Sequence, residues 1–173
     1  TVSGNIDRYT FNNLGVRYMK SRYDNAHVVL DDNISDGKQE MWKNPKIVIA
    51  GMTKCIEAVY TDEPLGIGVG AYAIYDFNGL DPYYLLGVLN AKTTTELLIK
   101  EFSDKHLAGG YLAINKSTIE KFRFPSCTDK KIQEEISSRA RKISSLKTES
   151  LLPDTTSIEM EIDKLVASLY KND

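Results

Sequence analysis

The chain has 173 residues, of which 42% are apolar and 27% are charged, and its 22 basic and 24 acidic side chains give a formal net charge of −2. These values exclude a disordered, collagen-like or mucin-like chain and indicate a globular protein that can bury a sizeable core without disulfides. The balanced charge also excludes a broadly cationic surface, so nucleic acid could bind only where basic side chains gather on one face.

Residues 1–41 are rich in Tyr, Asn, Asp and Arg and contain several turn signals, which predicts short strands and loops. Residues 46–50 form an apolar run between Pro45 and Gly51, and we expect them to pair as a hairpin with residues 55–60. A further strand is predicted over residues 71–76.

The pattern becomes helical from Asp81, which is placed to cap a helix that begins at Pro82 and breaks near Lys92. Residues 111–114 alternate like a strand, and residues 117–121 predict a short helical turn.

Pro125 and Ser126 indicate a boundary between a domain of residues 1–125 and a helical tail of residues 126–173. Two apolar stripes at helical spacing predict a hairpin of helices that turns near Pro153; they comprise Ile132, Ile136, Ala140 and Ile143, and then Ile158, Ile162, Leu165 and Leu169. The predicted fold class is therefore α+β, a mixed-sheet domain followed by a C-terminal helical hairpin. Each amphipathic helix needs a partner face on the other helix, the main domain or a second copy of the chain.

The sequence offers little support for catalysis in this chain. Gly66-Ile67-Gly68-Val69-Gly70 precedes a predicted strand instead of a helix, so it predicts a connector and not a phosphate loop. Leu80-Asp81-Pro82-Tyr83-Tyr84 is similar to the Asp-Pro-Pro-Tyr motif of amino-methyltransferases but lacks the second proline and opens a helix. His27 and His106 are far apart in the sequence and have no Cys or carboxylate at ligand spacing, which argues against a metal site.

The two cysteines, Cys55 and Cys127, are predicted to be small core residues of a protein in a reducing compartment, with a disulfide or a reactive thiol as the alternative. No apolar run approaches the roughly 18 residues of a membrane span. The chain begins at Thr1 without an initiator methionine, which predicts an excised fragment.

Cationic and aromatic side chains alternate in the loops, as in Arg17-Tyr18 and Arg22-Tyr23, and such residues supply both phosphate contacts and base contacts. Several blocks in order then resemble the TaqI-like C-terminal specificity domain of type IIG restriction-modification enzymes and adenine-specific DNA methyltransferases. The blocks are Gly4-Asn5-Ile6-Asp7-Arg8-Tyr9, Trp42-Lys43-Asn44-Pro45-Lys46-Ile47, residues 84–92, residues 105–116, Phe122-Arg123-Phe124-Pro125 and residues 162–170.

The resemblance implies a module that recognises double-stranded DNA, while an upstream methyltransferase domain binds S-adenosylmethionine and flips an adenine. We expect no catalytic residue, metal or cofactor in this chain, a bacterial or archaeal cytoplasmic location, no membrane contact, and helix-mediated self-association as an option. The candidates for phosphate contact are Lys43, Lys46, Lys54, Lys105, His106 and Lys116, and the candidates for base contact are Arg17, Lys20, Arg22 and Gln39. Trp42 and Tyr84 are predicted to be core residues, and the stem of Lys46 could also be packed.

The alternative is a protein-interaction module that acts through the C-terminal helices. Convergence of Lys43, Lys54, Lys105 and His106 on one concave face would favour DNA binding, whereas scattered lysines with an exposed apolar helical stripe would favour assembly. For the isolated chain we expect salt-sensitive DNA binding with a Kd of about 10⁻⁴ to 10⁻⁶ M or weaker.

Overall fold

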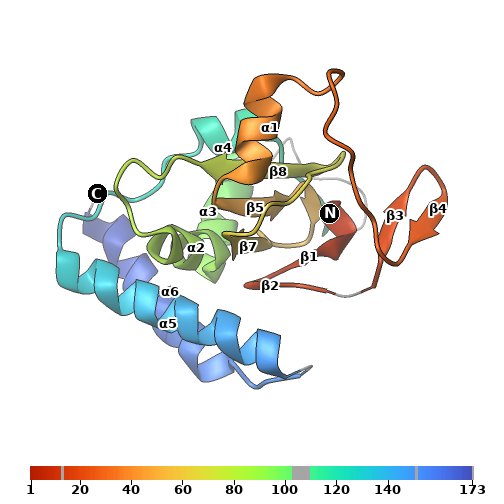
Figure 1. The fold of residues 1–173 in the computed structure, drawn as a ribbon. Helices are drawn as coiled ribbons and strands as arrows, with labels where there is room; N and C mark the ends of the chain where they lie inside the picture. Colours follow the sequence, from red (N-terminus) through yellow and green to blue (C-terminus); the bar gives the residue numbers. More distant parts are fainter. Residues whose placement is uncertain (13, 103–109, 151, 173) are drawn as a thin grey trace.

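The computed structural model describes residues 1–12, 14–102, 110–150 and 152–172, and it is an α+β fold that ends in a helical hairpin (Figure 1). The helices are α1 (Asp36–Lys43), α2 (Pro82–Asn90), α3 (Lys92–Glu101), α4 (Lys116–Lys121), α5 (Lys130–Glu149) and α6 (Thr156–Asn172), after a 3-10 turn at Ser3–Asn5. The strands are β1 (Ile6–Asp7), β2 (Thr10–Phe11), β3 (Val16–Tyr18), β4 (Ser21–Tyr23), β5 (Lys46–Ala50), β6 (Met52–Thr53), β7 (Ala58–Thr61), β8 (Ala71–Tyr75) and β9 (Leu112–Ala113).

The central sheet has three strands in the order β7-β5-β8. The predicted hairpin is confirmed, since β5 pairs with β7 in a register that places Ile49 opposite Ala58, and the predicted third strand is β8. Every described strand pair is antiparallel, so the expected mixed sheet is an antiparallel one. β8 pairs only with β5 among the described strands, which makes it an edge of the sheet.

The predicted helix from Pro82 forms, and it breaks as expected into α2 and α3. Asp81 caps α2, because its Oδ1 accepts a hydrogen bond from the amide of Tyr83 at 2.8 Å. Ala91 adopts an extended conformation, with φ −64° and ψ 140°, and so ends α2. The carbonyl of Val88 then accepts from the amide of Ala91 at 3.3 Å and from the hydroxyl of Thr94 at 2.6 Å, so the break leaves this acceptor satisfied.

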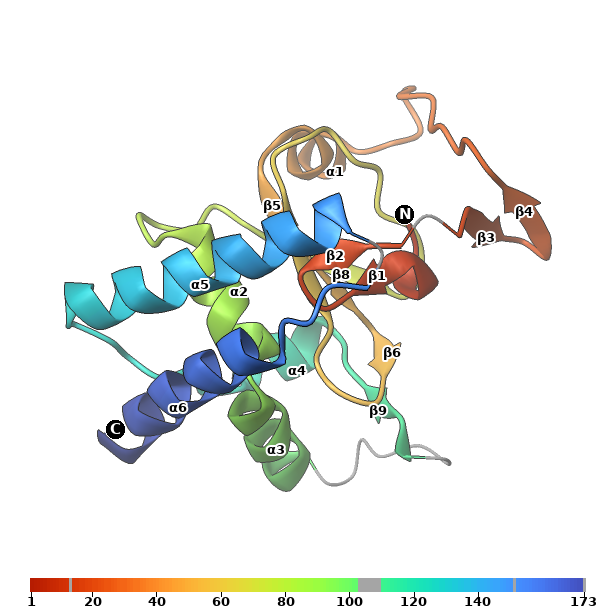
Figure 2. The same ribbon diagram turned by 90° about the horizontal axis from the view of Figure 1, so that it is seen from below.

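The C-terminal helices pack against the rest of the protein. Ile136 and Ala140 of α5 and Ile162 of α6 are fully buried in the same apolar cluster as Ile47 and Ile49 of β5. Figure 1 shows α5 and α6 beneath α2, and Figure 2, seen from below, shows them in front of it. The apolar stripes predicted from the sequence are therefore satisfied within the chain. The proposed boundary at Pro125 and Ser126 stays a prediction.

α1 is an element that the sequence analysis missed. Asp36–Lys43 lies in the region predicted to contain only strands and loops. Its Trp42 is 7% exposed and packs in a second apolar cluster with Val48 and Ala50, on the opposite face of β5 from Ile47 and Ile49. The packing of this one large aromatic side chain holds the short helix in place. The helix propensity of residues 36–43 is weak, so the sequence alone does not predict it.

The remaining predicted elements are short. The strand expected over residues 111–114 is β9, which pairs with β6, and the expected helical turn is α4, capped by the side chain of Asn115. Cys55 and Cys127 are both free and half-buried. Burial raises the pKa of the Cys55 thiol, which disfavours the reactive thiolate.

Candidate nucleic-acid interface

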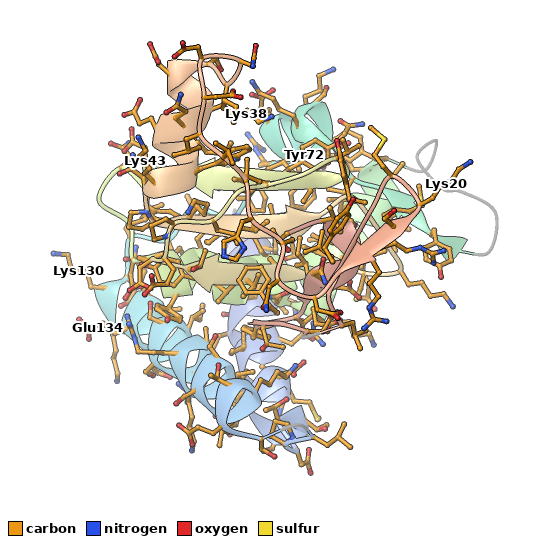
Figure 3. The ribbon with its side chains drawn as sticks, turned by 45° about the vertical axis from the view of Figure 1, so that its right-hand side comes forward. Lys20, Lys38, Lys43, Tyr72, Lys130 and Glu134 are labelled. Atoms are coloured by element: carbon orange, nitrogen blue, oxygen red, sulfur yellow. The ribbon has the colours of Figure 1, made fainter. Side chains whose placement is uncertain are left out.

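β3 and β4 form a two-stranded antiparallel ribbon that stands away from the central sheet and from the helices (Figures 1 and 2). Tyr18 pairs with Ser21, so the ribbon turns through only Met19 and Lys20. These two residues have φ values of 49° and 68°, the left-handed conformation that a type I′ hairpin turn requires at both central positions. The turn places Lys20 at the tip of the ribbon (Figure 3).

The ribbon has two different faces. Arg17 lies directly opposite Arg22 in the ladder, so both side chains project from the same face. The alternate positions, Val16, Tyr18 and Tyr23, line a groove on the other side of the ribbon. Arg17, Lys20 and Arg22 are all exposed. We call Arg17 and Arg22, together with Lys20 at the tip, the arginine face.

The arginine face carries positive charge that its surroundings compensate only weakly. Like charges directly opposite each other destabilise an antiparallel pair. The Nε of Arg22 lies 3.7 Å from Oδ1 of Asp24, but these side chains are 63% and 90% exposed, so solvent screens the pair. Within the described part of the chain, Arg17 forms no ion pair. A bound anion or a row of base acceptors would remove the repulsion between the two arginines.

A groove with a volume of about 1640 Å³ lies between the inner face of the ribbon, α1, α4 and the edge strand β8. Three lysines line it: Lys38 and Lys43 on α1, and Lys116 on α4. Figure 3 labels Lys38 and Lys43 on α1, and Tyr72 of β8, which lines the same groove. Lys43 and Lys116 were predicted phosphate contacts, and Lys38 was missed because nothing in the sequence placed residues 36–43 in a helix.

Two of these lysines already have partners. The Nζ of Lys38 lies 5.0 Å from the centre of the Trp42 ring, and the Nζ of Lys116 lies 3.6 Å from Oε1 of Glu120. The Lys116 pair is exposed, at 79% and 61%, so it leaves that lysine largely available.

Two of the side chains predicted to contact DNA form hydrogen bonds within the protein instead. Lys46 is fully buried, and its Nζ donates to the carbonyl of Glu63 at 3.2 Å. Burial lowers the pKa of Lys46, and no phosphate can reach the side chain in this structure. The amide nitrogen of Gln39 donates to the carbonyl of Ile34 at 2.9 Å and so holds the loop before α1. Neither residue is kept in the candidate interface.

Of the residues whose convergence would favour DNA binding, the two that the structure describes do not lie together. Lys43 lies on α1, whereas Lys54 follows β6, with its Nζ 5.6 Å from the centre of the Tyr111 ring. α1 and β6 occupy separate parts of the molecule in Figure 2. Lys105 and His106 lie outside the described residues. Among the described residues, the arginine face is therefore a better candidate for contact with an anionic ligand than Lys43 and Lys54.

The other motifs have structural roles. Gly66 to Gly70 lead into the edge strand β8 as a connector, and Asp81 caps α2 as predicted. Among the described residues no group of three or more His, Cys, Asp or Glu side chains could hold a metal ion. In the same part of the chain no helix has the length and apolar character needed to cross a membrane.

Comparisons with models of known protein families and with curated proteins give no match to this chain.

Proposed function

We propose that this chain is a recognition module for double-stranded DNA, and that it inserts the β3–β4 ribbon into the major groove. The observation that carries the proposal is the arginine face. The major groove of B-DNA is about 12 Å wide and admits a two-stranded β-ribbon. A ribbon that presents two opposed arginines and a lysine at its tip matches both the shape and the negative potential of that groove.

Within this proposal the cations have different tasks. Arg17 and Arg22 face the base edges, as the sequence predicts, whereas Lys20 at the tip is reassigned from a base contact to a phosphate contact. Lys43 and Lys116 beside the groove, and Lys54 beyond it, are candidates for further phosphate contacts that position the duplex. His106 and Lys105, which lie outside the described residues, stay candidates for phosphate contact as the resemblance implies.

The resemblance to the TaqI-like specificity domain supports a parent enzyme of the restriction-modification or adenine-specific methyltransferase type. The proposal assigns catalysis and S-adenosylmethionine to an upstream domain of the same parent, which flips the target adenine. The alternative function, assembly through the C-terminal helices, has less support, because Ile136, Ala140 and Ile162 are buried against the main body and offer no exposed apolar stripe.

The test is a fluorescence anisotropy titration of the chain against a random-sequence duplex at about 50 mM and about 200 mM salt. The intact chain is expected to bind more weakly at the higher salt concentration. Arg17→Ala/Arg22→Ala should weaken binding and reduce the salt dependence, because fewer counterions are released when the variant binds.

The matched control is Lys130→Ala/Lys131→Ala, which removes the same charge from exposed positions at the start of α5. Figure 3 shows Lys130 on the opposite side of the molecule from Lys20. The control should bind almost as the intact chain does. Equal losses in both variants would mean that net charge and not the arginine face determines binding, and absence of binding at low salt would overturn the proposed function.

A further inference from the structure

We infer that Arg17 and Arg22 recognise guanine, so that the ribbon selects DNA with two guanines on neighbouring or next-neighbouring base pairs. This inference rests on the proposed function and adds the chemical identity of the bases.

The guanidinium group determines the choice of base. Its planar set of N–H donors matches two acceptors side by side, and in the major groove guanine presents such a pair in O6 and N7. Adenine presents N7 beside a donor, and cytosine presents a donor, so neither accepts a two-donor contact. An arginine aimed at base edges therefore favours guanine.

The surroundings of the two side chains leave their terminal nitrogens available. Asp24 lies beside the Nε of Arg22 at 3.7 Å, and within the described residues no ion pair or hydrogen bond involves the terminal nitrogens of Arg22 or the guanidinium of Arg17. Because the pair is exposed, a base can approach Arg22 without first breaking a buried contact.

The ladder sets the spacing of the two contacts. Residues directly opposite each other in an antiparallel pair have Cα atoms roughly 4.5–5.5 Å apart. Base pairs are stacked at about 3.4 Å. Two arginines at this separation therefore reach neighbouring base pairs, or two base pairs with one other pair between them. Both arginines project from one face, so one insertion of the ribbon brings both to the base edges.

The experiment is a binding selection of the intact chain from duplex DNA with a randomised centre, repeated with Arg17→Gln, Arg22→Gln and Lys20→Ala. The intact chain should enrich two guanines within three successive base pairs, a window that follows from the spacing above. Each Arg→Gln variant should lose the guanine preference at one position and bind the enriched site at least about fivefold more weakly. Lys20→Ala should weaken binding to all sequences alike and keep both guanines.

A second measurement depends on the DNA and not on any variant. Replacing either enriched guanine by 7-deazaguanine removes the N7 acceptor and should weaken binding of the intact chain. DNA binding without guanine enrichment, or enrichment that survives both Arg→Gln substitutions and 7-deazaguanine, would overturn this inference and leave the proposed function standing. No binding to any duplex would overturn the proposed function itself.

Discussion

The side chain of Asn90 pairs with the backbone of Ala58 as a neighbouring strand would. Its Oδ1 accepts from the amide of Ala58 at 3.0 Å, and its Nδ2 donates to the carbonyl of Ala58 at 2.9 Å. Ala58 lies opposite Ile49 on β5, and its polar groups point away from that strand, toward α2. One side-chain amide at the end of α2 thus pairs with both backbone polar groups of Ala58, whose carbonyl also accepts from the amide of Tyr9 at 2.8 Å.

Replacing Asn90 by Ala should leave the buried amide of Ala58 without this acceptor, whereas the carbonyl of Ala58 keeps the hydrogen bond from the amide of Tyr9. Asn90 is 1% exposed, so water cannot readily substitute. We expect the free energy of unfolding to fall by about 1–3 kcal/mol, the cost of one unsatisfied buried donor. The midpoint of urea unfolding measures this loss, and Asn44→Ala at an exposed position is the control. A change of less than about 0.5 kcal/mol at Asn90 would mean that the paired hydrogen bonds contribute little.

A half-buried polar network connects the N-terminal hairpin to the C-terminal helices. Glu159 forms ion pairs with Arg8 and, at 3.3 Å, with Lys147, and its Oε1 accepts from the hydroxyl of Thr155 at 2.7 Å. Arg8 also donates to the carbonyl of Asn90 at 2.7 Å. Burial alone would raise the pKa of Glu159, but Thr155, Arg8 and Lys147 together hold that pKa below its ordinary value.

This network predicts a loss of stability in acid. Because the pKa of Glu159 is lower in the folded state, the unfolded state binds more protons once the pH falls below about 4.5, and stability then decreases as the pH falls through the folded-state pKa. Glu159→Gln should lower the free energy of unfolding at pH 7 by about 3 kcal/mol and weaken its dependence on acidic pH. Urea unfolding from about pH 7 to about pH 3 tests this. A variant with the same acid dependence as the intact chain would exclude Glu159 as its source.

Close packing between α2 and α5 requires a glycine. A Cβ at Gly87 would lie 2.5 Å from Cγ2 of Ile136, closer than real side chains approach. Gly87→Ala gains helix propensity of about 1 kcal/mol but overpacks the contact, and we expect a net loss of about 1–2 kcal/mol. Ile136→Leu removes the β-branch, so the double variant should lose less stability than the sum of the single variants. Strict additivity in thermal unfolding would show that the two positions do not compete for space.

Asp24 is expected to oppose DNA binding, because its carboxylate lies beside the arginine face. Asp24→Asn removes this negative charge and should strengthen binding to random-sequence duplex several-fold at low salt, with a smaller gain at high salt. Asp36→Asn on α1, outside the ribbon, provides a matched change of charge. Equal gains in the two variants would argue against a specific effect at the ribbon.

The sequence predicts the parts of the fold that have strong local signals. The N-cap at Asp81 and the apolar stripes of α5 and α6 depend on residues close in the sequence, and these helices formed as expected. α1 has no side-chain hydrogen bond at its cap and depends on the burial of Trp42, which only the folded protein defines.

The candidate site could be predicted only in part, because the type of a residue does not determine where its side chain points in the folded protein. Arg17 and Arg22 were expected to contact DNA, but the sequence did not predict that they lie opposite each other on one hairpin. The hairpin turns at Met19 and Lys20, and neither is the glycine or asparagine that usually indicates such a turn. Lys46 was expected to contact phosphate because it is charged. Its place at the start of the central strand β5 buries it instead.

The central claim is that the β3–β4 ribbon enters the major groove of duplex DNA. The most direct measurement is displacement of the intact chain from a duplex by methyl green, which occupies the major groove, and by distamycin, which occupies the minor groove. We predict that methyl green displaces the chain and that distamycin does not. Displacement by distamycin alone would place the contact in the minor groove and contradict the account.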